Sequence, residues 1–136
     1  MKNKAHSFAF LVVGASLSGL ACAADKAVPA NCSGKSCTAT VTVASCDKIQ
    51  VTPDPIVVAK GARPVMRWTL ATPGWSFTDN GIDILKHGGE FDGKAKESGT
   101  AFKWNNKNKL PGKYKYDVNV TDGKQACRLD PTIVNQ

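Results

Sequence analysis

The stretch Leu110-Pro-Gly-Lys-Tyr-Lys-Tyr-Asp-Val-Asn-Val-Thr121 decides the fold class of this chain. After a Pro-Gly turn, residues 114, 116, 118 and 120 are aromatic or β-branched, and polar residues alternate with them. This period of two is typical of a strand with one buried face. The stretch ends at Asp122-Gly123, which favours a tight hairpin because both residues tolerate positive φ. The sequence therefore predicts a β-strand that leads into a hairpin.

Comparable patterns recur along the chain between Gly, Pro and Asn turns, and no segment has a sustained apolar period of 3.6 residues. Residues 71–81 and 87–99 are expected to be loops, and Asp130-Pro131 should interrupt the last strand. Seven to eight short strands predict an all-β fold, an antiparallel Greek-key β-sandwich. Strands are expected at residues 38–44, 48–52, 54–61, 63–70, 82–85, 100–104, 110–121 and 125–134.

The apolar residues that share one face of each expected strand form the predicted core. They are Val41, Val43, Val51, Val57, Met66, Trp68, Leu70, Ile82, Ile84, Phe102, Trp104, Tyr114, Tyr116, Val118 and Val120.

Residues 1–23 have the pattern of a secretory signal peptide. Lys2 and Lys4 precede an apolar run, and Ala21-Cys-Ala23 offers small residues for cleavage. The alternative is a lipoprotein with lipidated Cys22, although Gly19 stands where such sites usually have Leu. Residues 24–37 are then an irregular segment and residues 38–136 the sandwich domain. No second long apolar run follows, so no transmembrane segment is expected after cleavage, and the protein is predicted to be periplasmic or secreted.

Removal of residues 1–23 leaves 16 Lys and Arg and 11 Asp and Glu, a net charge of +5. The cations are spread along the chain with acids between them. A basic exported protein can meet polyanions such as anionic lipid headgroups or nucleic acid, and the alternative is an ordinary solvated surface. The expected partners are an envelope protein, a glycan or a polyanion, and nucleic acid is not favoured.

An even number of cysteines remains after the signal peptide: Cys32, Cys37, Cys46 and Cys127. In an exported chain this predicts two disulfides. Of three possible connectivities, we favour Cys32–Cys37, which closes a short turn, and Cys46–Cys127, which ties the first strand region to the last. A four-cysteine zinc site is not expected, because the paired short spacings of such sites are missing.

Two parts of the chain together resemble the cupredoxin-like family. One comprises Ile49-x-Val-x-Pro53, Ile56-Val-Val-x-Lys-Gly61 and Val65-x-x-Trp68, and it looks like the family's early strand pair. The other is Pro111-Gly-Lys-Tyr-Lys-Tyr116, which looks like the strand that leads to the family's copper site. The resemblance implies a cupredoxin-like β-sandwich. An immunoglobulin-like sandwich is the alternative, because it shows much the same alternation.

The family's copper chemistry requires two imidazoles, a thiolate and usually a weak axial Met. The thiolate position, two residues after the second aromatic residue, is Val118 here. After signal removal the chain has one histidine, His87, and one methionine, Met66, which is expected in the core. The resemblance therefore implies the fold without the copper ligands, and no cofactor is expected.

His87 is the residue on which any other chemistry would depend. With nearby acids it would bind a divalent metal such as copper weakly, or serve as a general base; the alternative is a solvent-exposed loop residue. A small secreted hydrolase would need His87 beside Ser76, Ser98 or a pair of carboxylates. The carboxylates available in this region are Asp79, Asp83, Glu90 and Asp92.

Trp75 and Phe77 lie in the expected loop at residues 71–81. Loops at the end of a sandwich often carry binding residues, and an exposed Trp can stack on a sugar ring or a base. The alternative is that Trp75 plugs the open end of the sandwich. The sequence thus predicts a non-enzymatic binding module of the cell envelope that uses Trp75, Phe77 and His87, with weak metal binding and hydrolysis as alternatives.

Overall fold

A computed structural model describes residues 28–136, so the predicted signal peptide and Cys22 lie outside the described residues. These residues form strands joined by turns and loops, without a helix, and hence without any apolar helix long enough to cross a membrane. The strands are β1 (Ser36–Ser45), β2 (Lys48–Thr52), β3 (Ile56–Val58), β4 (Val65–Leu70), β5 (Ser76–Ile84), β6 (Phe91–Ser98), β7 (Ala101–Asn106), β8 (Gly112–Thr121), β9 (Ala126–Leu129) and β10 (Thr132–Asn135).

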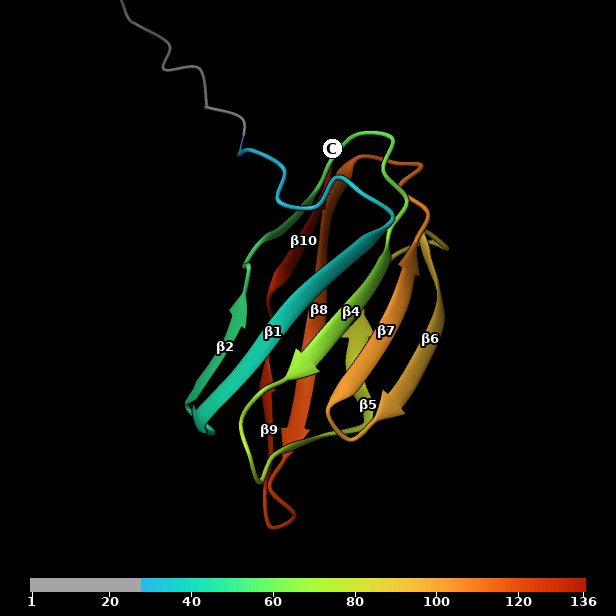
Figure 1. The fold of residues 1–136 in the computed structure, drawn as a ribbon. Helices are drawn as coiled ribbons and strands as arrows, with labels where there is room; N and C mark the ends of the chain where they lie inside the picture. Colours follow the sequence, from blue (N-terminus) through green and yellow to red (C-terminus); the bar gives the residue numbers. More distant parts are fainter. Residues whose placement is uncertain (1–27) are drawn as a thin grey trace, which may run out of the picture.

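The strands form two sheets that pack face to face (Figure 1). One sheet has the order β2-β1-β4-β7-β6. The other has the order β3-β10-β8-β5, and β9 pairs with β8 as well. β9 and β10 follow the same edge of β8 and are separated at Asp130-Pro131, where an interruption was predicted.

The all-β class is confirmed, whereas the prediction of a purely antiparallel sandwich is wrong. β1 pairs with β4 in parallel, and β10 pairs with β3 in parallel. Both sheets are therefore mixed. Alternation along one strand reports only which face is buried, so it carries no information on the direction of the neighbouring strand.

The prediction of seven to eight strands is also wrong, because residues 28–136 contain ten. The interrupted last strand counts as two, and β6 replaces most of a predicted loop. β5 begins at Ser76 because Asp79-Asn80-Gly81 makes an irregularity inside a strand rather than a loop. Gly81 is needed there, since a Cβ atom on it would lie 2.6 Å from Phe77 Cβ.

The core lies between the sheets and contains almost every residue predicted for it. All are buried except Tyr114, which is half-buried at the start of β8. Trp68 on β4 and Tyr116 on β8 meet across the two sheets, with the indole Nε1 donating to the Tyr116 hydroxyl at 3.3 Å. Trp104 Nε1 donates to the Ile82 carbonyl oxygen at 2.9 Å, so a second indole also links the sheets.

The predicted cysteine pairing is confirmed. Cys32 and Cys37 have Cα atoms 5.6 Å apart, and those of Cys46 and Cys127 are 5.2 Å apart. The Cys46–Cys127 pair links the β1–β2 turn in one sheet to β9 in the other. Two disulfides are typical of proteins that fold in an oxidising compartment outside the cytoplasm.

The loops gather at two ends of the sandwich (Figure 1). We call "upper end" the segments at residues 28–35, 59–64, 85–90 and 107–111. We call "lower end" the connections at residues 46–47, 71–75, 99–100 and 122–125.

Candidate functional site

The residues that the sequence predicts for binding do not form one site. Trp75 precedes β5 at the lower end, and His87 follows β5 at the upper end. The nine residues of β5 lie between them. At about 3.3 Å per residue, this strand separates their backbones by roughly 25–30 Å.

Phe77 is buried in a strand, contrary to the prediction that it lies in an exposed loop among the binding residues. Its side chain is only 1% exposed and packs edge-on against Phe102, with ring centroids 6.0 Å apart. Phe77 belongs to a strand face rather than to a loop, so its ring points into the core. Trp75 is half-buried and packs against the core, as expected of a residue that plugs this end.

The His87 side chain packs against two aromatic residues at the upper end. Its ring packs edge-on against Phe91 and Trp104, with centroids 5.9 and 5.6 Å away. The Gly89 N–H donates to His87 Nδ1 at 3.2 Å. Ser76 and Ser98 lie at the lower ends of β5 and β6, so neither is placed to act as a nucleophile beside this imidazole.

The four candidate carboxylates are each engaged elsewhere. Asp79 pairs with Lys96 at 3.2 Å, and Asp83 pairs with Lys94 at 3.0 Å. A hydrogen bond from the Asn105 amide, together with Lys107, lowers the pKa of Asp92 from its ordinary value. Glu90, the fourth carboxylate, accepts backbone hydrogen bonds in the upper end.

The described residues do not fit a copper centre of the kind that the cupredoxin-like family uses, with two imidazoles and a thiolate. Within residues 28–136, no three His, Cys, Asp or Glu side chains are grouped so that they could hold a metal. Val118 is fully buried, and Met66 lies in the core with 1% exposure. Cys127 is paired with Cys46, so it offers no thiolate.

Glu90 holds two upper-end loops together. Its side chain is 5% exposed, and its Oε2 atom accepts hydrogen bonds from the N–H groups of Lys109 at 2.8 Å and Leu110 at 3.0 Å. The Lys107 N–H donates to the Glu90 carbonyl oxygen at 2.8 Å. A buried carboxylate is normally costly, and here backbone donors compensate for its lost hydration.

Three buried asparagines extend this network to a third segment. Asn106 and Asn135 exchange side-chain hydrogen bonds of 2.7 and 3.2 Å, and the Asn108 N–H donates to Asn106 Oδ1 at 2.9 Å. Asn108 Nδ2 donates to the carbonyl oxygens of Ala59 and Ala62, both at 2.9 Å. Residues 59–64 and 107–111 are thus fixed to each other although they are far apart in the sequence.

A groove of about 650 Å³ lies between these two loops. Three of its side chains are cationic and exposed: Lys60, Arg63 and Lys109. Gly61 allows the turn between the first two, because its φ of +82° is in the left-handed region that favours glycine. The groove is lined by Lys60, Gly61, Arg63, Asn108, Lys109, Pro111 and Gln136.

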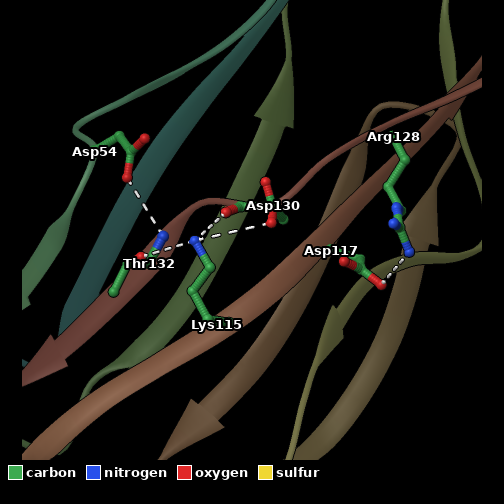
Figure 2. A network of polar contacts seen from close by, with 6 residues as sticks. All are labelled: Asp54, Lys115, Asp117, Arg128, Asp130 and Thr132. Atoms are coloured by element: carbon green, nitrogen blue, oxygen red, sulfur yellow. Dashed lines mark hydrogen bonds and ion pairs between the residues drawn. The ribbon is translucent and has the colours of Figure 1, made fainter.

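The groove cations have no carboxylate partner within 4.0 Å in the part of the chain that the structure describes. Lys115, on the outer face of β8, differs (Figure 2). Its Nζ atom donates to the Asp130 carbonyl oxygen at 2.6 Å and to Thr132 Oγ1 at 3.4 Å, with Asp130 Oδ2 4.0 Å away. Arg128 pairs with Asp117 at 3.5 Å in the same view. Lys115 thus bonds to the connection between β9 and β10, and Arg128 bonds to β8, whereas the groove cations remain available to a ligand.

One buried polar atom at the groove is unsatisfied. Asn108 is 8% exposed, and its Oδ1 atom has no hydrogen-bond partner among the described residues. Both amide hydrogens of Asn108 are already used, so this oxygen can only accept a hydrogen bond. A buried acceptor without a donor destabilises the fold, and a ligand hydroxyl or a bridging water would compensate for it.

A second concavity, of about 550 Å³, lies over the β1–β2 hairpin. It contains one acid and one base, Asp47 and Lys48, and therefore has no net charge. Thr72 Oγ1, at its border, already accepts from the Val43 N–H at 2.8 Å. The charge and the unsatisfied acceptor both point to the upper groove instead.

Sequence reasoning missed this groove. The signal that could have found it is the presence of Lys and Arg on both Lys60-Gly-Ala-Arg63 and Lys107-Asn-Lys109, two turn-like stretches.

No protein-family model matches this chain, and no curated protein matches it. The geometry of the groove is therefore the feature that points to a function.

Proposed function

We propose that this protein is an exported, non-enzymatic binding module of the cell envelope that holds an anionic group of an envelope component in the upper groove. The observation that carries the proposal is the convergence of Lys60, Arg63 and Lys109, all without a carboxylate partner among residues 28–136, on one groove. Hydrogen bonds to the buried residues Glu90 and Asn108 fix the loops that present these cations, so little ordering is required on binding.

The chemistry of the groove favours a phosphate, sulfate or carboxylate that carries neighbouring hydroxyl groups. The Arg63 guanidinium can donate two parallel hydrogen bonds to such an anion, and the two lysines contribute point charges. A hydroxyl beside the anion would supply, directly or through a water, the donor that Asn108 Oδ1 lacks. Glycan phosphates and glycerophosphate groups have this combination.

The proposed compartment is the periplasm or the exterior of the cell. The two disulfides support it, and so does the signal-peptide pattern of residues 1–23. The proposed fold family is cupredoxin-like with Greek-key topology and without copper. Its support is the contact between Trp68 and Tyr116, the aromatic residues of the two resembling stretches, whose ring centroids are 5.4 Å apart.

Binding of dextran sulfate by the oxidised, exported protein tests the proposal, with uncharged dextran as the reference polymer. The variant Lys60→Gln/Arg63→Gln/Lys109→Gln should bind dextran sulfate at least about tenfold more weakly, because it lacks the groove charges. Its unfolding free energy should stay within about 0.5 kcal/mol of the unmodified protein, since exposed unpaired side chains contribute little to folding.

A matched variant controls for total charge. Lys48→Gln/Lys103→Gln/Lys124→Gln removes the same number of cations outside the groove and should weaken binding by less than about threefold. Trp75→Ala, at the lower end, should leave binding unchanged. Equal losses in both triple variants would show that only net charge matters, and the proposed groove would then be wrong.

A further inference from the structure

Exposed apolar side chains gather at the same end as the groove. Among the residues that the structure describes, the large exposed apolar side chains are Val28 at 56%, Leu85 at 37% and Leu110 at 61%. All three lie in or beside the upper-end segments. Leu110 stands between the groove residues Lys109 and Pro111, so apolar and cationic side chains share one surface.

The backbone holds both leucines in place. The Leu110 N–H donates to Glu90 Oε2 at 3.0 Å, and the Leu110 carbonyl oxygen accepts from the Tyr114 hydroxyl at 3.2 Å. The Leu85 N–H donates to the Lys115 carbonyl oxygen at 3.0 Å. The side chains are therefore presented to solvent by ordered loops, and their exposure is a fixed feature of this end.

A shallow concavity of about 300 Å³ connects this apolar surface to further cations. It is lined by Leu85, Lys86, Lys113, Tyr114 and Lys115. Among these lysines, Lys86 and Lys113 have no carboxylate within 4.0 Å in the described part of the chain. Half-buried Tyr114 lines the same concavity as Leu85, and its hydroxyl donates to the Leu110 carbonyl oxygen.

We infer that the upper end docks on an anionic lipid surface. The groove takes the phosphate of a lipid headgroup, and Leu85 and Leu110 enter the boundary between headgroups and acyl chains. This inference rests on the proposed function, because it names the source of the anion that the same groove would bind.

The combination of charge and apolar surface favours a lipid over a polysaccharide. Cations close to a membrane are attracted to anionic headgroups, and apolar side chains beside them gain further stabilisation by leaving water. A charged polysaccharide satisfies the cations and leaves the exposed leucines in water. Glycerol-bearing phospholipid headgroups also carry hydroxyl donors close to the phosphate, and Asn108, which lines the groove, has a side-chain oxygen that lacks a donor.

Co-sedimentation with vesicles tests the inference. The oxidised, exported protein is mixed with vesicles of phosphatidylcholine alone, or of phosphatidylcholine with phosphatidylglycerol. We expect binding at least about tenfold stronger to the vesicles that contain phosphatidylglycerol, decreasing as salt is added. Binding that does not depend on phosphatidylglycerol would overturn the inference.

Two leucine variants separate lipid docking from simple anion binding. Leu85→Ser/Leu110→Ser should reduce vesicle binding about fivefold or more and leave dextran sulfate binding unchanged, because it alters only the apolar part of the surface. Leu85→Met/Leu110→Met keeps the apolar character and should retain vesicle binding. Thermal unfolding of both variants shows whether they remain folded.

The outcomes also separate this inference from the proposed function. Wild-type binding to dextran sulfate without binding to phosphatidylglycerol vesicles would overturn lipid docking and leave the anion groove standing. Lipid docking would also be overturned, and the anion groove would stand, if Leu85→Ser/Leu110→Ser sediments with vesicles to the same extent as wild type. Loss of groove specificity in the triple cation comparison would instead overturn the proposed function and, with it, the lipid inference.

Discussion

The two ends of the sandwich differ in how their loops are held and in what they expose. At the lower end, the loop at residues 122–125 closes on itself, with Asp122 Oδ1 accepting from the N–H groups of Lys124 and Gln125 at 2.9 Å. The Cys46–Cys127 disulfide also lies at this end. At the upper end, loops from distant parts of the sequence are bonded to one another through the buried groups of Glu90 and Asn108.

Charge follows the same division. The upper-end segments carry six Lys or Arg residues and one carboxylate, the buried Glu90, whereas the lower-end connections carry two acids and one lysine. The comparison shows that a loop whose backbone is satisfied by buried polar groups can leave its charged side chains to solvent. Those side chains are then available to a ligand without loss of stability.

The largest effect is expected from the disulfide at the lower end. Cys46 and Cys127 are 81 residues apart in sequence, and Cys32 and Cys37 only 5. In the chain-entropy model, Cys46→Ala/Cys127→Ala should lower the unfolding free energy by about 4 kcal/mol, and Cys32→Ala/Cys37→Ala by about 2 kcal/mol. Guanidinium unfolding without reductant measures both. Equal losses would show that loop length does not decide the contribution of each bridge.

A smaller loss is expected when the upper-end network is broken. Glu90→Ala removes the acceptor for the N–H groups of Lys109 and Leu110, and it should lower the unfolding free energy by about 2–3 kcal/mol. It should also weaken dextran sulfate binding, because the loop that carries Lys109 loses two of the hydrogen bonds that hold it.

Glu90→Gln is the matched control for this variant. It keeps a side-chain carbonyl oxygen for the two donors, so it should lower the unfolding free energy by at most about 1 kcal/mol. If Glu90→Ala proves as stable as Glu90→Gln and binds dextran sulfate normally, then the upper-end loops are not held by this carboxylate. The contrast between the two ends would then fail.

The sequence predicted the strands that contribute alternate side chains to the core. Tyr116, Val118 and Val120 are buried on the face that was expected, and so are Met66, Trp68 and Leu70 on β4. β6 was not predicted, because it is an edge strand in which only Phe91 is buried. A strand with so few buried residues has no apolar alternation to recognise.

The candidate groove was harder to predict than the core. Its cations are visible in the sequence, but their grouping depends on hydrogen bonds between residues such as Asn108 and Ala62, which are 46 positions apart. Polar residues in a loop are usually exposed, so nothing in the sequence indicated that Glu90 and Asn108 are buried. Phe77 is the converse case. Because turn-forming residues surround it, a loop was predicted there, but its side chain is buried in the core.

The smallest effect concerns the lower end and depends on pH. Hydrogen bonds from the backbone N–H groups of Gln125 and Lys124 lower the pKa of Asp122 in the folded protein from its ordinary value of 3.8. A carboxylate with a lowered folded pKa stabilises the fold above its unfolded pKa, and this contribution disappears as the pH falls through the folded value. Asp122→Ala should therefore destabilise the protein slightly at neutral pH and progressively less as the pH falls below 3.8.

Guanidinium unfolding of wild type and variant across this acid range measures the difference. Asp122→Asn keeps a neutral acceptor for the same N–H groups. At neutral pH it should therefore lower the unfolding free energy less than Asp122→Ala does. Binding of dextran sulfate at neutral pH should be unchanged in both variants, because the turn at residues 122–125 lies at the opposite end from the groove. A destabilisation of the same size at acid and neutral pH would contradict the role given to this carboxylate, and a change in binding would show that the two ends are not independent.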